Sequence, residues 1–142
     1  MMMTAFDISA SALVAQRVRM DTISSNLANM SSMQRDANGE MQPYDARYVI
    51  FQTDDKISTP YGATGVKVAS VQTEQIEPLY RWQPNHPYAI QEGPKKGYVA
   101  YPKVNMNAEF VDALVATRAY EANVGVMEIT KTMSQQTLRI LA

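Results

Sequence analysis

The first segment of the chain, from about residue 5 to about residue 30, carries apolar residues at a regular spacing. Phe6, Leu13, Met20 and Leu27 are each seven positions apart, and Ile23 adds an intervening position. Residues seven apart lie on the same side of an α-helix, because seven residues make almost two turns. This segment therefore predicts a helix with a coiled-coil stripe.

Short polar side chains suggest where this helix begins and ends. Asp7 and Ser9 are the two candidate amino-terminal caps, since their oxygens can accept hydrogen bonds from the first free backbone N–H groups. Asn26 and Asn29 gather with serines at the other end, where they compete for backbone hydrogen bonds. We expect the helix to end there.

The last segment, from about residue 107 to residue 141, reads as a longer helix with two apolar stripes. One stripe contains Met106, Phe110, Ala113, Tyr120, Val124, Met127, Leu138 and Leu141. The other contains Val115, Ala119, Ala122, Val126, Ile129, Met133 and Ile140. At about 100° per residue, positions 113 and 115 point about 200° apart, so the stripes lie on nearly opposite sides.

A helix with two apolar faces requires a neighbour on each side. The first helix can supply one neighbour, and the second neighbour is either more of the same chain, as in a monomeric bundle, or another molecule. Because the sequence contains only one other strong helix, the chain cannot enclose the last helix alone. This favours burial through oligomerisation.

The middle of the chain is interrupted by helix-breaking residues. All seven prolines lie between Pro43 and Pro102, and five of the six glycines lie between Gly39 and Gly97. Short runs with strand character fall at 47–52, 66–68 and 79–82. The predicted fold class is α+β, with long terminal helices forming a coiled-coil-like pair and a β-rich or irregular insert between them. The expected division is residues 1–33 for the first helix, 34–103 for the insert and 104–142 for the last helix.

Composition excludes several classes of function. The 142-residue chain has a formal charge of −1 and scattered basic residues, so nucleic-acid binding is not expected. It has no cysteine, which excludes disulfides and cysteine-based metal sites. No apolar run approaches the ~20 residues that span a bilayer, so stable membrane insertion is not expected. The first residues also lack the pattern of a cleaved secretory signal.

Candidate catalytic groups are few. His86 is the only histidine, and it lies in a proline-flanked turn without a cysteine or a serine elbow to activate. Glu74 with Glu77, or Asp54 with Asp55, could form an acid/base pair for cutting glycans, but sequence spacing does not establish the carboxylate separation. No glycine-rich phosphate loop occurs. We therefore expect no enzymatic activity, no cofactor and no metal.

Three segments resemble the family of flagellar rod and hook axial proteins. Residues 6–9 and 24–29 are similar to the amino-terminal signature of that family. Residues 97–105 are similar to a segment that marks its proximal rod proteins, and residues 118–124 resemble its carboxy-terminal helix. The segments occur at both ends of the chain and in the family's order.

This resemblance implies a structural role in the bacterial flagellar basal body. Proteins of this kind stack helically into the proximal rod, which crosses the periplasm and passes torque from motor to hook. Their terminal helices form an inner layer that lines the export channel, and the middle segment forms an outer part. The implied partners are copies of the chain, other flagellar rod proteins and the flagellar type III export apparatus, through which the chain would leave without a cleaved signal peptide.

The residues expected to form the assembly interface lie in the two terminal helices. In the first helix they are Phe6, Leu13, Met20, Ile23, Asn26, Leu27 and Asn29. In the last helix they are Phe110, Leu114, Val115, Tyr120, Ala122, Asn123, Val124, Val126, Met127, Ile129, Met133 and Leu138. The alternative function is a soluble helical adaptor or binding module linked to export, which would form a one-to-one complex rather than an open polymer.

Overall fold

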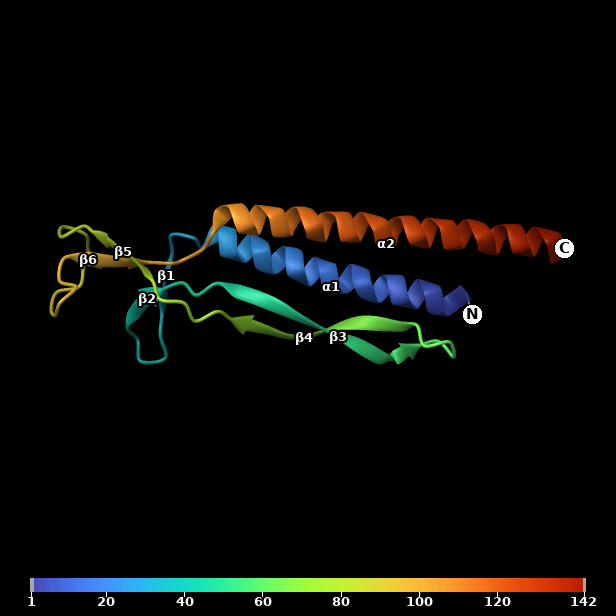
Figure 1. Cartoon of the computed structure of the whole chain (residues 1–142), viewed down its shortest axis with the longest axis horizontal. Coiled ribbons are helices and arrows are strands. Elements are labelled where there is room, and N and C mark those ends of the chain that lie inside the picture. Colours follow the sequence, from blue (N-terminus) through green and yellow to red (C-terminus); the bar gives the residue numbers. More distant parts are fainter. Residues whose placement is uncertain (1, 142) are drawn as a thin grey trace.

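The computed structural model describes residues 2–141, with side chains described from residue 5 onward, and is dominated by two long helices. Helix α1 (Met2–Ala28) and helix α2 (Met106–Leu141) lie side by side and antiparallel (Figure 1). Their 27 and 36 residues correspond to lengths of about 40 and 54 Å. The terminal helices predicted from the apolar spacing are confirmed.

The middle of the chain forms three two-stranded antiparallel hairpins. The pairs are β1 (Met33–Arg35) with β2 (Met41–Pro43), β3 (Arg47–Ser58) with β4 (Thr64–Thr73), and β5 (Leu79–Trp82) with β6 (Tyr98–Tyr101). The three runs predicted as strands fall within β3, β4 and β5. The α+β class is confirmed, and β1, β2 and β6 are additional strands that the sequence pattern did not predict.

The β3–β4 hairpin runs along α1 on the side opposite α2 (Figure 1). It begins at the pair Arg47 and Thr73, and bulges interrupt its register after Ile50 and after Asp54. The approach to α1 is close at Gly65, where an added Cβ would lie 3.0 Å from the Ser11 Oγ. Helix α1 is therefore the middle of three layers.

This layering explains which residues of α1 remain exposed. They form one narrow stripe consisting of Asp7, Val14, Arg17, Asp21, Ser24 and Ala28. The expected amino-terminal caps are wrong, because α1 already begins at Met2, with Asp7 exposed inside the helix and Ser9 only 4% exposed. The packing of α1 between α2 and the β3–β4 hairpin outweighs the local preference of Asp7 and Ser9 for a helix end.

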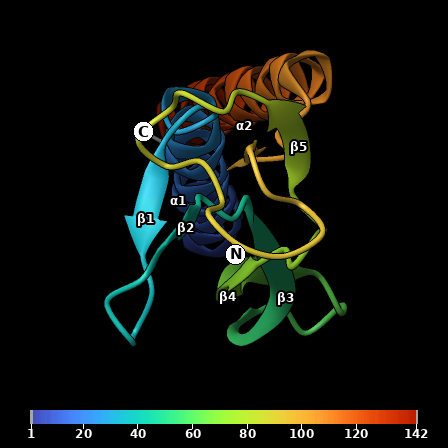
Figure 2. The same ribbon diagram turned by 90° about the vertical axis from the view of Figure 1, so that its left-hand side faces the viewer.

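The remaining two hairpins form a tip beyond the end of the helix pair (Figure 1). Figure 2 looks at the molecule from this end and shows β1 and β5 on opposite sides of the tip. Val99 on β6 is completely buried and forms the centre of the tip. The turn before β6 requires Gly97, whose φ is +81° and whose added Cβ would meet the Trp82 ring at 2.6 Å.

Candidate assembly surface

Asn26, near the end of α1, joins three parts of the fold. Its Nδ2 donates hydrogen bonds to the Arg47 carbonyl oxygen at 2.8 Å and to the Glu109 Oε1 at 3.0 Å. Its Oδ1 accepts hydrogen bonds from the Arg47 N–H at 2.9 Å and from the Tyr44 hydroxyl at 3.1 Å. The side chain is 2% exposed. A buried amide with all its donors and acceptors used fixes the position of each partner, so Asn26 locks α1 to the start of β3 and the start of α2.

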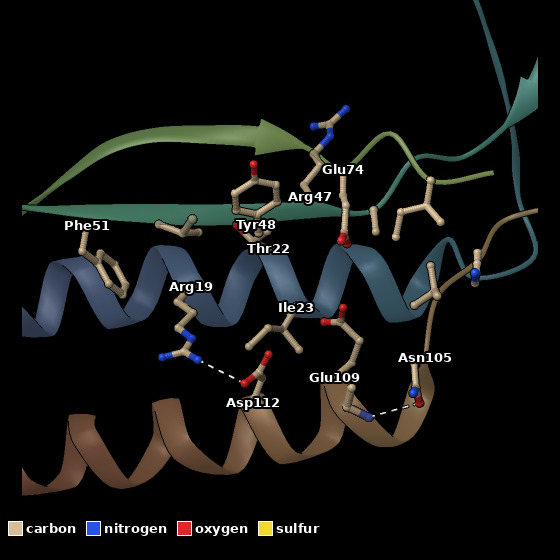
Figure 3. Close-up of a pocket in the computed structure, with 16 residues that line it drawn as sticks. Arg19, Thr22, Ile23, Arg47, Tyr48, Phe51, Glu74, Asn105, Glu109 and Asp112 are labelled. Carbon is tan, nitrogen blue, oxygen red and sulfur yellow. Dashed lines mark hydrogen bonds and ion pairs between the residues drawn. The ribbon is translucent and has the colours of Figure 1, made fainter. Parts of the chain in front are cut away.

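A groove opens beside this junction, between α1, β3 and the first turns of α2 (Figure 3). Its cavity volume is about 540 Å³, and its lining is partly apolar, including Ile23 and Phe51. The Arg19 guanidinium pairs with the Asp112 carboxylate across the groove at 3.1 Å. Asn105 begins α2 as its cap, since its Oδ1 accepts hydrogen bonds from the N–H groups of the second and third following residues.

Glu109 is the carboxylate in this groove that the fold perturbs. Burial raises the pKa of Glu109 above its ordinary value. The hydrogen bond from Asn26 opposes that rise in pKa, while the neighbouring carboxylates of Asp112 and Glu74 add to it. Glu109 therefore lies near two other carboxylates, in a groove that Arg19, Arg47 and Lys103 also line.

The contact between α1 and α2 covers a single stripe of α2. The stripe alternates by three and four residues and consists of Glu109, Ala113, Ala116, Tyr120, Asn123, Met127, Thr130 and Ser134, with Ala119, Val124 and Gly125 beside it also partly covered. Many of these residues are small or polar, and on the α1 side the buried Gln16 Oε1 has no hydrogen-bond partner within the described residues. The helix pair consequently buries little of the apolar surface that α2 carries.

The outward face of α2 holds that unburied apolar surface in two patches. The amino-terminal patch consists of Met106, Phe110, Val111, Leu114 and Val115. The carboxy-terminal patch consists of Val126, Ile129, Met133, Leu138, Ile140 and Leu141. Between the patches the surface is polar, with an ion pair between Arg118 and Glu121 at 2.9 Å. Large exposed apolar patches mark surfaces that other molecules cover.

The residues expected in the assembly interface are divided between the inside and the outside of the protomer. Ile23 and Asn26 are buried, so their contacts are within the chain. A second group is partly covered and comprises Phe6, Leu13, Met20, Leu27, Asn29, Tyr120, Asn123, Val124 and Met127. The exposed group comprises Phe110, Leu114, Val115, Ala122, Val126, Ile129, Met133 and Leu138. The sequence had no signal that separated these groups, because all of them follow helical spacing.

The groups considered for catalysis occupy ordinary surface positions. The His86 Nδ1 accepts a hydrogen bond from the Tyr88 N–H at 3.2 Å. Glu77 pairs with Lys95 at 3.2 Å, and Asp54 lies 4.0 Å from Lys67. Among the described residues, no group of three or more His, Cys, Asp or Glu side chains could hold a metal ion, and no helix is long and apolar enough to cross a membrane.

Comparison with known proteins relates both helices to flagellar rod proteins. Residues 6–32 match the family model described as "Flagella basal body rod protein". Residues 95–140 match the model described as "Flagellar basal body rod FlgEFG protein C-terminal". The two models therefore cover α1 and, with β6, nearly all of α2.

Full-length relatives are more specific. The flagellar basal-body rod protein FlgC of Salmonella typhimurium is 40% identical over 95% of this chain and 94% of its own length. FlgC of Bacillus subtilis is 40% identical over 97% of this chain and 99% of its own length. FlgC of Borreliella burgdorferi is 35% identical over 97% of this chain and 96% of its own length. The chain belongs to the FlgC family.

As an FlgC protein, the chain is a structural subunit of the proximal rod of the flagellar basal body and not an enzyme. Membership of a rod family means that it assembles with rod proteins. The FlgC fold described here gives the amino-terminal signature a definite role within the protomer, since Asn26 in that signature connects α1, β3 and α2.

Proposed function

We propose that this FlgC protein polymerises helically through the outward face of α2, using the two apolar patches as its main contacts with neighbouring subunits. The helices, within residues 1–33 and 104–142, form the inner layer of the rod around the export channel. The insert, residues 34–103, forms the outer part. The resulting tube crosses the periplasm and transmits torque.

The observation that supports this proposal is the exposure of large apolar side chains along one face of α2. Phe110, Leu114 and Ile129 are 56%, 59% and 63% exposed, respectively. Burying the exposed half of such a side chain contributes about 1 kcal/mol, since full burial contributes about 1.5–3 kcal/mol. The exposed members of both patches together therefore contribute on the order of 10 kcal/mol.

That contribution is similar to the cost of bringing two molecules together, which is about 4–15 kcal/mol. A single pair of subunits is therefore weakly held. A subunit in a closed helical lattice contacts several neighbours but loses its translational and rotational freedom only once. This arrangement favours growth at an existing end of the rod over association in solution. We further propose that the neighbours are copies of the chain and other rod proteins, and that the chain arrives through the flagellar type III export apparatus, as its family resemblance implies.

The experiment is a matched pair of valine substitutions. Val126→Asp places a charge in the carboxy-terminal patch, and Val71→Asp places the same charge on β4 at nearly the same exposure, 48% against 46%. Both variants should fold, because neither side chain is buried. Val126→Asp should abolish rod assembly and motility while leaving synthesis and export intact, and Val71→Asp should retain assembly. Normal motility of the Val126→Asp strain would contradict the proposed role of this face.

A further inference from the structure

Asn38 is the only asparagine in the chain that is followed by glycine. It lies in the turn between β1 and β2, and both Asn38 and Gly39 are exposed. In Figure 2 the loop that follows β1 projects away from the helix pair. Gly39 has a φ of +83°, and no atom beyond its chain neighbours lies within 4 Å of the position that a Cβ would occupy. The space beside the Gly39 backbone is therefore open.

An asparagine side chain reacts slowly with the backbone nitrogen of the residue that follows it. The nitrogen attacks the side-chain carbonyl carbon and forms a C–N bond, the bond to the side-chain nitrogen breaks, and that nitrogen leaves as ammonia with the proton of the attacking N–H. The product is a five-membered succinimide ring, which water opens at one of its two carbonyls to give aspartate or isoaspartate. A side chain on the following residue hinders the attack, and glycine has none.

One hydrogen bond slows this reaction in the folded turn. The Gly39 N–H donates to the Asp36 carbonyl oxygen at 2.9 Å, and the Asp36 N–H donates to the Glu40 carbonyl oxygen at 2.8 Å. The Gly39 nitrogen must lose its hydrogen bond before it can turn toward the Asn38 side chain. Because one such bond favours the closed turn by roughly fivefold, the reaction is slowed but not prevented.

We propose that Asn38 is a site of spontaneous deamidation, which places a carboxylate on the tip. The formal charge of the chain changes from −1 to −2, because one neutral side chain becomes anionic. The new carboxylate lies two residues from both Asp36 and Glu40, which it repels. In the isoaspartate product the main chain gains one carbon, so the hydrogen bonds across the turn lose their present geometry. Both products therefore loosen the β1–β2 hairpin, which contains three residue pairs.

Asn85 is a matched control within the same molecule. It is also exposed and also lies in a turn of the tip. The N–H of the next residue, His86, donates to the Gln83 carbonyl oxygen at 3.1 Å, so the attacking nitrogen is held by a hydrogen bond of the same spacing as at Gly39. The main difference is the side chain of the following residue, which is an imidazole at His86 and absent at Gly39. Asn85 should therefore react far more slowly than Asn38.

Incubation of the purified full-length protein at neutral pH tests the site. Peptide mapping by mass spectrometry follows both asparagines, and an isoaspartyl carboxyl methyltransferase with labelled S-adenosylmethionine measures the isoaspartate product. We expect conversion at Asn38 and none detectable at Asn85 over the same period. In guanidinium chloride, where the turn is open, Asn38 should react roughly fivefold faster than in the native protein. Equal conversion at the two asparagines, or an unmodified Asn38 in the native protein, would overturn the proposal.

Two variants separate the reaction from its effect on the hairpin. Asn38→Gln keeps an amide but would need a six-membered ring, so it should suppress the conversion and leave the hairpin unchanged. Asn38→Asp carries the charge of the aspartate product from the start, and hydrogen exchange at the Asp36 amide should be roughly twofold faster than in freshly purified wild-type protein. Unchanged exchange, both in this variant and in converted wild-type protein, would refute the loosening. None of these outcomes involves α2, so failure here leaves the proposed function standing.

Discussion

Replacing Asn26 with alanine removes all four hydrogen bonds at the junction of α1, β3 and α2. Two of the lost partners, the N–H and carbonyl oxygen of Arg47, are bonded to Asn26 at 2.9 and 2.8 Å and form no other hydrogen bond with a side chain within residues 2–141. The other two are less affected. The Tyr44 hydroxyl also lies 3.3 Å from the Ser25 Oγ, and the Glu109 carboxylate faces a groove that water can enter.

The expected loss of stability follows from these differences. A buried polar group left without a partner costs about 1–3 kcal/mol, so two such backbone groups place the loss at about 2–6 kcal/mol. That is a large part of the 5–15 kcal/mol by which a domain is ordinarily stable. The matched control is Asn29→Ala, in the turn just after α1, where the amide only donates to the Ser25 carbonyl oxygen at 2.9 Å. We expect this change to cost less than about 1 kcal/mol.

Denaturant unfolding of the purified protein, followed by circular dichroism, measures both variants. Hydrogen exchange at the Arg47 amide adds a local readout, because that N–H donates directly to Asn26 and should exchange faster only in Asn26→Ala. Equal unfolding free energies for Asn26→Ala and Asn29→Ala, within about 0.5 kcal/mol, would show that the Asn26 hydrogen bonds do not hold the junction together.

Two other substitutions test the tip and the groove. Gly97→Ala should destabilise the tip by about 1–3 kcal/mol more than Gly93→Ala. Both glycines have φ above +80°, but only an added Cβ at Gly97 would overlap the Trp82 ring. The fluorescence of this single tryptophan reports the change, and equal effects of the two substitutions would refute the overlap. Glu109→Gln keeps an acceptor for Asn26 and removes the charge of this partly covered carboxylate. Since the pKa of Glu109 is raised in the folded state, the wild-type protein loses stability as pH rises from the unfolded-state pKa near 4.5 through the folded-state value. Glu109→Gln should therefore be more stable than the wild-type protein at pH 7 and equally stable at a pH well below 4.5. Denaturant unfolding at both pH values measures the difference, and a gain in unfolding free energy that persists at low pH would have another cause.

The sequence predicted the elements better than it predicted their contacts. The seven-residue period and the placement of proline and glycine identified both helices and the strands β3, β4 and β5, because these features are local. The capping expectation at Asp7 and Ser9 failed, because packing against two layers extends α1 beyond them. Strand β6 lies within the family-like segment 97–105, and its residues, Tyr98–Tyr101, do not alternate between apolar and charged or strongly polar side chains, so the sequence pattern did not identify it as a strand.

The role of Asn26 illustrates what sequence patterns omit. The sequence indicates Asn26 as part of the amino-terminal signature and as a residue near the helix end, but its hydrogen-bond partner Glu109 is 83 positions away. Likewise, both stripes of α2 were visible in the sequence, and the expectation that the first helix covers only one side agrees with the exposed patches. Polar residues such as Gln16 also enter the contact between α1 and α2. Their identity depends on the register of the two helices, which are joined by a long insert, and cannot be obtained from the sequence of either helix alone.

The tip is connected to the helix pair by residues 29–32 and 102–105 and to the β3–β4 hairpin by residues 44–46 and 74–78, and its strands pack chiefly against each other around Val99. Asn26 sits where these stretches meet the helices. A load on the tip reaches α2 directly through residues 102–105, and the Asn26 hydrogen bonds couple the start of α2 to α1 and β3. We expect these hydrogen bonds to keep α1, β3 and α2 in a single arrangement, while the four connecting stretches let the tip adjust to differently oriented neighbours.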